Sequence, residues 1–227
     1  IYLQVPGFET AFITGSTIAH IFSGVSIRAL RYYIRHQRRT QLEEPSSLNH
    51  PTADGLIFSQ DGHRDDVGLG GLASLFGLGY KRAWISRLTP ELTPLTFSGY
   101  LLIPVGLAHY SLFRGAPLKV DGDSSLVSLQ YISHVLRSGS SQYWNIFQAI
   151  SLVGLVWLGT YHMVSGLWKI RKRFSKRDKR LGYILVNGFT ILSVFSLLRI
   201  RRLGFDTGFM GKQYAKYLAQ AMAEAFR

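Results

Sequence analysis

The sequence contains no cysteine and few acidic residues. The absence of cysteine excludes disulfide bonds, thiolate zinc sites, iron–sulfur clusters, covalently attached c-type haem and a cysteine nucleophile. Charged residues make up only 17% of the 227 residues, against roughly 25% in an average soluble chain. The 26 Lys and Arg residues outnumber the 13 Asp and Glu residues and give a net charge of +13. Because 47% of the residues are hydrophobic, this charge must lie between long neutral stretches, and a nucleic-acid partner is not expected.

Four stretches of the chain have the length and composition of membrane-spanning helices. A bilayer core requires roughly 20 predominantly apolar residues. The four stretches are residues 10–28, 95–113, 144–168 and 181–198, and apart from Arg28 none contains Lys, Arg, Asp or Glu. The sequence therefore predicts an all-α integral membrane bundle that forms a single domain over residues 1–227. The alternative is a soluble all-α domain, which the low mean hydropathy of +0.10 leaves open.

The remaining segments are less apolar. Residues 41–66 are rich in Pro, Ser, Asn, Asp and Gly and read as a flexible loop, and Pro104 is expected to kink the second span. Residues 67–80 are apolar but rich in glycine and too short to span, which predicts an interfacial or re-entrant segment. In the tail, residues 203–227, a short amphipathic helix is expected to lie on the membrane or to cap the bundle. Its apolar face consists of Tyr214, Tyr217, Leu218, Ala221 and Met222.

Basic residues predict the orientation of the bundle in the membrane. Five arginines lie between Arg28 and Arg39 after the first span, and eight cations lie between Lys169 and Arg180 after the third. With alternating crossings these two segments share a side, which the positive-inside rule places in the cytosol. The cations from Arg199 to Arg202 fall on the opposite side and weaken the bias.

Two histidines inside predicted spans share a sequence context. His20 and His162 both begin the pattern His-x-x-Ser-Gly, which places Gly24 and Gly166 one helical turn later on the same face. Ionisable groups inside a membrane are costly and are often functional. The repeat predicts that the two imidazoles lie at one depth, where they could hold the iron of haem b while both glycines leave room for the porphyrin.

The alternative is that both histidines are neutral and satisfied by polar partners inside a tightly packed bundle. His109 stands apart near the end of its span. The other four histidines, at positions 36, 50, 63 and 134, are expected in loops and lack the spacing of metal ligands. The sequence also lacks a phosphate-binding loop, a Gly-x-Ser-x-Gly elbow and a carboxylate pair in an apolar setting. The sequence therefore predicts a protein that is not an enzyme.

Several short motifs resemble the transmembrane domain of the fungal mitochondrial adapter proteins. The motifs are Ala19-His20 with Gly24, Ser98-Gly99-Tyr100, Ala108-His109, Gly122-Asp123-Ser124-Ser125 with Tyr131 and His134, His162-Met163-Val164 with Gly166, and Gly208 to Tyr214. The resemblance implies an integral protein of the mitochondrial outer membrane that acts in lipid homeostasis. It also implies that a fifth membrane helix and a cytosolic segment precede the first residue of this sequence.

The same resemblance implies two partners. One is the phospholipid membrane, and the other is a bridge-like lipid-transfer protein that the adaptor recruits or receives at organelle contacts. Scrambling of the delivered phospholipids between leaflets is a further implied activity.

The pattern His-x-x-x-Gly on two helices is also similar to the membrane-anchor subunits of succinate dehydrogenase, in which such histidines bind haem b. This second resemblance implies an alternative function, a bis-histidine membrane cytochrome in electron transfer or redox sensing. The sequence shows no quinone site and no soluble redox domain, so haem binding is better supported than electron transfer.

Overall fold

The computed structural model describes residue 12, residues 14–42, residue 69 and residues 93–138, 142–172, 175–204 and 207–225. Its regular structure in these ranges is entirely helical, which confirms the predicted all-α class. The chain divides into two compact units, Ile1–Ala53 and Asp54–Arg227. The predicted loop lies outside the described residues from position 43 onward, and so do His50 and His63.

The first unit contains one long helix, α1 (Gly15–Leu42). It continues well past the predicted end at residue 28, because residues 29–42 contain neither Gly nor Pro and include many good helix formers. His36 therefore lies in a helix, and its predicted loop position is wrong. The ring of Tyr32 lies 6.3 Å from that of His36, and Gln37 Nε2 donates to Tyr33 Oη at 2.8 Å, as residues one turn apart can do.

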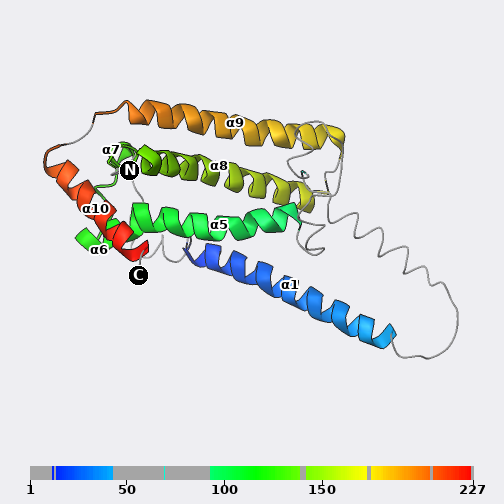
Figure 1. The fold of residues 1–227 in the computed structure, drawn as a ribbon. Coiled ribbons are helices and arrows are strands. Elements are labelled where there is room, and N and C mark those ends of the chain that lie inside the picture. The colour runs from blue at the N-terminus through cyan, green and yellow to red at the C-terminus, as the bar shows by residue number, and fades with distance from the viewer. Residues whose placement is uncertain are drawn as a thin grey trace. The chain divides into compact units, whose positions relative to one another are not determined.

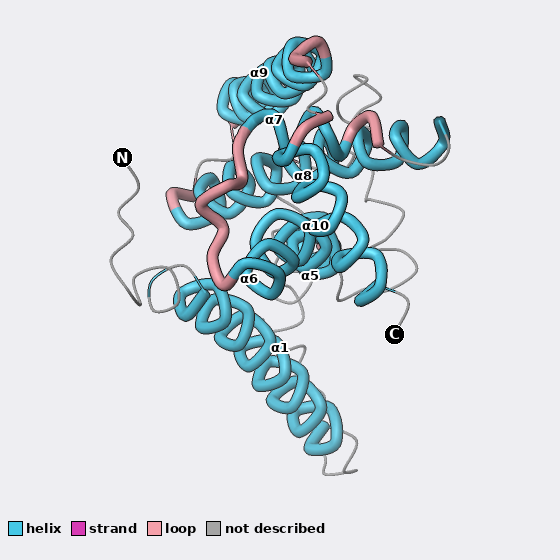
Figure 2. Tube along the Cα trace, turned by 90° about the vertical axis from the view of Figure 1, so that its left-hand side faces the viewer, coloured by secondary structure: helices cyan, strands magenta, loops and turns pink. Residues whose placement is uncertain are grey.

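The second unit is built on three long helices, α5 (Pro94–Tyr110), α8 (Gln142–Ile170) and α9 (Lys176–Arg201). Helix α8 packs against both others, and Figure 1 shows the three side by side. Figure 2, turned by 90°, shows the same order, with α8 between α5 and α9. We call the end at which residues 171–175 join α8 to α9 the hairpin end.

Three segments are long and apolar enough to cross a membrane by length and composition, namely Pro94–Asp121, Gln142–Ile170 and Lys176–Arg201. They correspond to the second, third and fourth predicted spans. The first predicted span is not among them within the described residues, because Arg28 and Arg31 fall within the first 18 residues from Gly15 and lower their mean hydropathy. A fourth and a fifth span therefore stay predictions, as does the internal repeat.

Local sequence signals explain where the helices begin and end. Thr93 caps α5 by accepting a hydrogen bond from the Thr96 amide, with Pro94 as the first helical residue. Helix α5 continues through Pro104 and is followed by a π-helical turn, Ser111–Gly115, and α6 (Ala116–Asp121). Gly122 ends α6 with a φ of 80°, a left-handed conformation that glycine adopts without strain.

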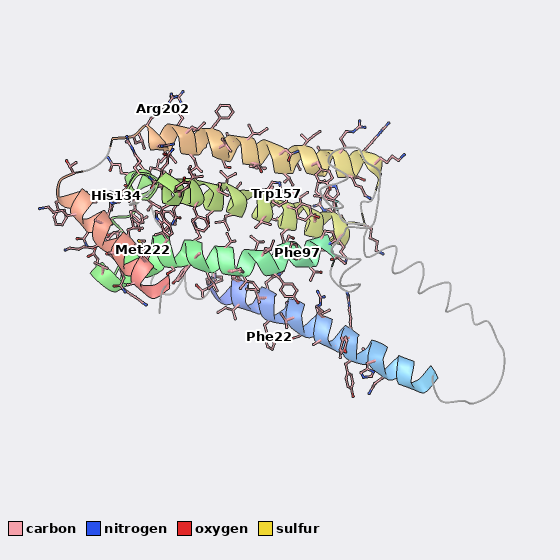
Figure 3. All side chains as sticks on the ribbon, viewed as in Figure 1. Phe22, Phe97, His134, Trp157, Arg202 and Met222 are labelled. Carbon is pink, nitrogen blue, oxygen red and sulfur yellow. The ribbon has the colours of Figure 1, made fainter. Side chains whose placement is uncertain are left out.

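The opposite end of the unit, which we call the cap end, is formed by α6, α7 (Leu129–Val135) and α10 (Phe209–Ala225). Figure 3 shows His134 of α7 and Met222 of α10 at this end. The predicted apolar face of the tail helix packs inward, which answers whether that helix caps the bundle. The hydrophobic core of the cap end consists of Leu112, Phe113, Tyr131, Val135, Tyr214, Tyr217 and Leu218.

Helix α7 was not expected from the sequence. Ser128 caps it by accepting a hydrogen bond from the Gln130 amide, and Tyr131 and Val135, one turn apart, are both buried. His134 therefore lies in a helix and is buried, with its ring centroid 5.7 Å from that of Tyr214. The predicted loop position of His134 is wrong because tertiary packing of Tyr131 and Val135 in the cap-end core stabilises this short helix.

Candidate functional site

His162 of α8 is held against the first turn of α5. Its Nδ1 lies 3.2 Å from the carbonyl oxygen of Leu95 and 3.2 Å from Ser98 Oγ. Ser98 Oγ itself donates to the Leu95 carbonyl at 2.8 Å. Because a carbonyl oxygen can only accept, the network favours the tautomer with the proton on Nδ1. In this tautomer Nε2 of His162 is the unprotonated ring nitrogen.

Gly99 makes this close approach of α5 and α8 feasible. A Cβ atom built on Gly99 would lie 2.8 Å from His162 Cε1 and 3.3 Å from Nδ1. These distances are shorter than van der Waals contact, so a side chain at position 99 would displace the ring. Ser98 and Gly99 were noted in the sequence only as part of a family motif, since no spacing rule links them to a histidine 63 or 64 positions later.

The predicted haem ligands lie in different units. His20 is an exposed residue of α1, and its carbonyl accepts a hydrogen bond from Ser23 Oγ at 3.0 Å. Cβ atoms built on Gly24 and Gly166 would have no neighbour within 4 Å. Such open space suits a porphyrin edge, but it equally suits a glycine that faces lipid. Pairing of His20 with His162 therefore stays a prediction. Within the described ranges no group of three His, Cys, Asp or Glu side chains could hold a metal ion.

The hairpin end concentrates positive charge. Five cations are exposed and make no side-chain hydrogen bond or ion pair with a described residue, and we call them the hairpin cations. They are Arg171, Lys172, Lys176, Arg177 and Arg180. Asp178 is the one acidic residue between positions 169 and 180, and its carboxylate accepts from Ser175 Oγ at 2.7 Å. The site therefore presents a strongly positive surface at the end of two candidate spans.

Specific contacts fix the helix ends on either side of the hairpin. Lys172 adopts a φ of 51°, which a non-glycine residue seldom does, and so terminates α8. Ser175 caps α9 by accepting from the Asp178 amide, and the indole of Trp168 donates to the Asp178 carbonyl at 2.8 Å. Trp168 is buried. These contacts fix the end of α8 and the start of α9, next to which the hairpin cations lie.

Leu69 packs against both α8 and α9 near the hairpin end. It is the one described residue of the glycine-rich segment 67–80, and it is fully buried among Tyr161, Val164, Trp168 and Val186. Its carbonyl accepts a hydrogen bond from Tyr183 Oη. The Leu69 side chain lies directly over Gly182, where a Cβ atom would collide with it.

Hydrogen bonds from tyrosines hold the cap end together. Tyr131 Oη donates to the Leu112 carbonyl at 3.0 Å, while Tyr217 Oη and Gln213 Nε2 both donate to the Asp121 carboxylate. Burial raises the pKa of Tyr131, and a charge on Tyr217 would raise it further. The pKa of Tyr217 is raised to about 12, mainly by burial and to a smaller extent by the hydrogen bond to Asp121. Both phenols therefore remain neutral donors at physiological pH.

Two predicted motifs also have structural roles here. The Ser125 amide and hydroxyl donate to the Asp123 carboxylate at 3.0 and 2.9 Å. Both hydrogen bonds lower the pKa of Asp123, and the one from the backbone amide has the larger effect. The ring of His109 lies 4.7 Å from the ring of Phe113. Both motifs shape the connection between α5 and α7 and show no ligand-binding geometry.

Comparison with known proteins agrees with this architecture. Residues 104–213 match the family model described as MDM10-complementing protein 1, transmembrane domain. The chain is also 25% identical over 204 residues to the mitochondrial adapter protein MCP1 of Saccharomyces cerevisiae, an alignment that covers 87% of this chain and 59% of the relative. This chain thus spans less than two thirds of that relative. No solved structure matches it. Residues 104–213, somewhat less than half of the chain, are thus similar to this transmembrane domain, and the chain is similar over most of its length to a mitochondrial adapter protein.

Proposed function

We propose that this domain is the membrane part of a mitochondrial outer-membrane adaptor in lipid homeostasis, with the hairpin end in the cytosol. The observation that carries the proposal is the set of hairpin cations at the end of two candidate spans. Short loops rich in Lys and Arg remain on the cytosolic side. A positive surface near the bilayer attracts anionic headgroups, with about 1 kcal/mol for each basic residue. On this proposal the domain has a non-enzymatic role.

The proposed partner at this surface is the membrane-facing end of a bridge-like lipid-transfer protein. A transfer protein delivers phospholipids to the cytosolic leaflet, so its end must come close to anionic headgroups. The hairpin cations lie where such an end would meet the adaptor, and electrostatic attraction accelerates encounters of this kind. The relative of this chain is itself named an adapter protein, which supports recruitment of a partner.

Charge removal at one end of the bundle tests the proposal. Replacement of the five hairpin cations by Gln is expected to lower the rate of lipid delivery into vesicles that contain the full chain by about tenfold or more. A matched control replaces five exposed cations of the cap end. These are Arg199, Arg201, Arg202, Lys212 and Lys216. The control is expected to keep the original rate, whereas a loss in the control alone would contradict the proposed orientation.

Exchange of the delivered lipids between leaflets belongs to the same proposal. A groove of about 310 Å³ lies between α8 and α9 inside two candidate spans. It is lined by Leu152, Val156, Phe189, Leu192, Ser193, Ser196 and Leu197. The two serine hydroxyls donate to carbonyls of their own helix, so their oxygens still offer lone pairs to a passing headgroup. Vesicles that contain the domain should exchange labelled lipid faster than empty vesicles, and equal rates would remove this activity.

Binding of haem b is a second candidate function, and one observation favours it. Histidines that bind a metal almost always donate their other ring N–H to a carbonyl or carboxylate, as Nδ1 of His162 would do to the Leu95 carbonyl in the favoured tautomer. On this candidate function, His162 and His20 would hold the haem iron. Bound haem would supply one-electron redox chemistry, while Ser98 and Leu95 would orient the imidazole.

Absorption spectroscopy tests the haem candidate directly. Protein purified from haem-replete cells should show a reducible Soret band that disappears in His162→Ala and in His20→Ala. His109→Ala is the matched control, because His109 also lies in a candidate span but packs against the ring of Phe113. This variant should keep the Soret band. A folded protein without a Soret band would exclude haem.

A further inference from the structure

A heptad stripe of exposed residues runs along one flank of α9. Its members are Ile184, Asn187, Ile191, Val194 and Leu198, with alternating spacings of three and four residues. All five are exposed, and Ile184 and Ile191 have exposed fractions of 60% and 56%. Helix α9 contacts α8 through a different face, which carries the buried Gly182 and Val186. The stripe has the spacing with which helices pack side by side at a small crossing angle.

Asn187 is the unusual member of this stripe. It lies seven residues after Arg180, which places it about 10 Å into the span at a rise of 1.5 Å per residue. Its carboxamide makes no hydrogen bond with any described residue. In hydrocarbon, an amide without a partner is costly, because no water is present to replace the missing bonds. A side chain too short to reach the headgroups therefore requires a partner within the membrane.

The other polar side chains in the middle of α9 are already satisfied. Thr190, Ser193 and Ser196 donate to carbonyl oxygens of their own helix at distances of 2.7, 2.7 and 2.9 Å. Tyr183 Oη donates to the Leu69 carbonyl. The unmet hydrogen bonds of the apolar stretch, within the described residues, thus concentrate at Asn187. This position lies at the centre of the heptad stripe.

We propose that α9 packs in parallel against α9 of a second copy of this chain across a two-fold axis, with Asn187 paired to Asn187 of the partner. A carboxamide both donates and accepts, so two of them form a symmetric pair of hydrogen bonds. Two copies with the same orientation in one membrane bring identical residues to identical depth. A single Asn in a heptad seam is a known means of fixing register and the number of helices.

The geometry of α9 keeps this seam separate from the lipid groove. Leu192 lines the groove, whereas Ile191, the preceding residue, belongs to the stripe. Successive residues of a helix are rotated by about 100°, so the two surfaces lie on different flanks. Dimerisation through the stripe would therefore leave the groove open to lipid. The proposal is independent of the adaptor function.

Cysteine cross-linking in the membrane tests the seam, and the chain is suited to it because it contains no cysteine. Ile191→Cys is expected to yield a covalent dimer of the full chain under mild oxidation, since residues of a symmetric seam approach within disulfide range. Leu192→Cys is the matched control, with an exposed fraction of 60% against 56% for Ile191. It is expected to remain monomeric.

A second variant tests the role of the carboxamide. Hydrogen bonds between membrane helices contribute about 0.6–1.7 kcal/mol, which corresponds to a change of about 3- to 20-fold in an association constant. Energy transfer between labelled copies, measured as the protein is diluted with lipid, should show a loss of this size in Asn187→Leu. Asn187→Gln, which keeps the amide, should retain part of the association. The helical content of the variants, measured by circular dichroism, reports whether they fold.

Four outcomes would overturn the proposal. Equal cross-linking of Ile191→Cys and Leu192→Cys would indicate random collision. Association that is unchanged in Asn187→Leu would remove the carboxamide pair. A protein that is monomeric in lipid at every concentration would remove the dimer. A second cysteine placed in α1 that cross-links to Ile191→Cys within one chain would show that another helix covers the stripe.

Discussion

Replacement of Tyr131 by alanine is expected to lower the free energy of unfolding of the second unit by about 3–5 kcal/mol, the usual cost of removing a buried aromatic ring. Tyr131 has an exposed fraction of 0%. Its ring centroid lies 5.5, 5.1 and 5.7 Å from those of Phe113, Tyr214 and Tyr217. One truncation therefore removes contacts to the π-helical turn and to α10 at the same time.

Two further variants separate the ring from its hydroxyl group. Tyr131→Phe keeps the ring and loses only the hydrogen bond to the Leu112 carbonyl, for which about 0.5–1.5 kcal/mol is expected. Tyr143→Ala is the surface control, since Tyr143 has an exposed fraction of 85% and its truncation should change stability by no more than about 0.5 kcal/mol. Equilibrium unfolding in detergent, together with proteolysis of α10, measures all three. A similar loss in Tyr131→Phe and Tyr131→Ala would show that the ring contacts contribute little.

The long helices of the second unit could be predicted because their signal is simple. Uninterrupted apolar stretches of about 20 residues have few alternatives in a protein, and all three in this unit correspond to candidate spans. The apolar face of α10 was predicted for a similar reason, since Tyr214, Tyr217 and Leu218 recur at helical spacing. What these signals could not supply was the partner of each face, which depends on residues far away in the sequence.

The cap end shows where local reasoning failed. Helix α7 is short, and the sequence around His134 contains no long periodic pattern. Its stability comes from tertiary contacts, such as the hydrogen bond that Tyr214 Oη donates to the Leu126 carbonyl and the hydrogen bond between Tyr214 Oη and Ser128 Oγ, which span 88 and 86 positions. Short helices of this kind are marginal alone and form because they are packed. No property of residues 129–135 alone could have predicted that packing.

The candidate site divides in the same way. His162 was singled out as a residue to be explained, because an imidazole inside an apolar stretch is unusual. Its partners Leu95, Ser98 and Gly99 were not predicted, since a backbone carbonyl and a glycine carry no chemical signature. The hairpin cations were found from composition alone. The fixed helix ends next to them, which depend on Lys172 and on the Trp168 bond to Asp178, required the structure.

A side chain at position 99 is expected to separate α5 from α8. In Gly99→Ala the new methyl group would lie 2.8 Å from His162 Cε1, and the ring cannot yield freely while Nδ1 is bonded to Leu95. Either the helices move apart or the imidazole leaves its network. Overpacking of this kind lowers stability by about 1–3 kcal/mol. Thermal unfolding in detergent should therefore show a lower midpoint for Gly99→Ala.

Gly106→Ala on the same helix is the matched control, because a Cβ atom there would have no neighbour within 4 Å. Alanine is favoured over glycine in a helix by up to about 1 kcal/mol, so this variant should be unchanged or slightly more stable. Nitrogen-15 resonances of the His162 imidazole provide a second measurement, since they report which ring nitrogen is protonated. Gly99→Ala should shift the Nδ1 resonance, and Gly106→Ala should not. If Gly99→Ala were as stable as Gly106→Ala and left the Nδ1 resonance in place, the fixed imidazole would not depend on close contact of the two helices, and the support for His162 as an oriented ligand would be lost.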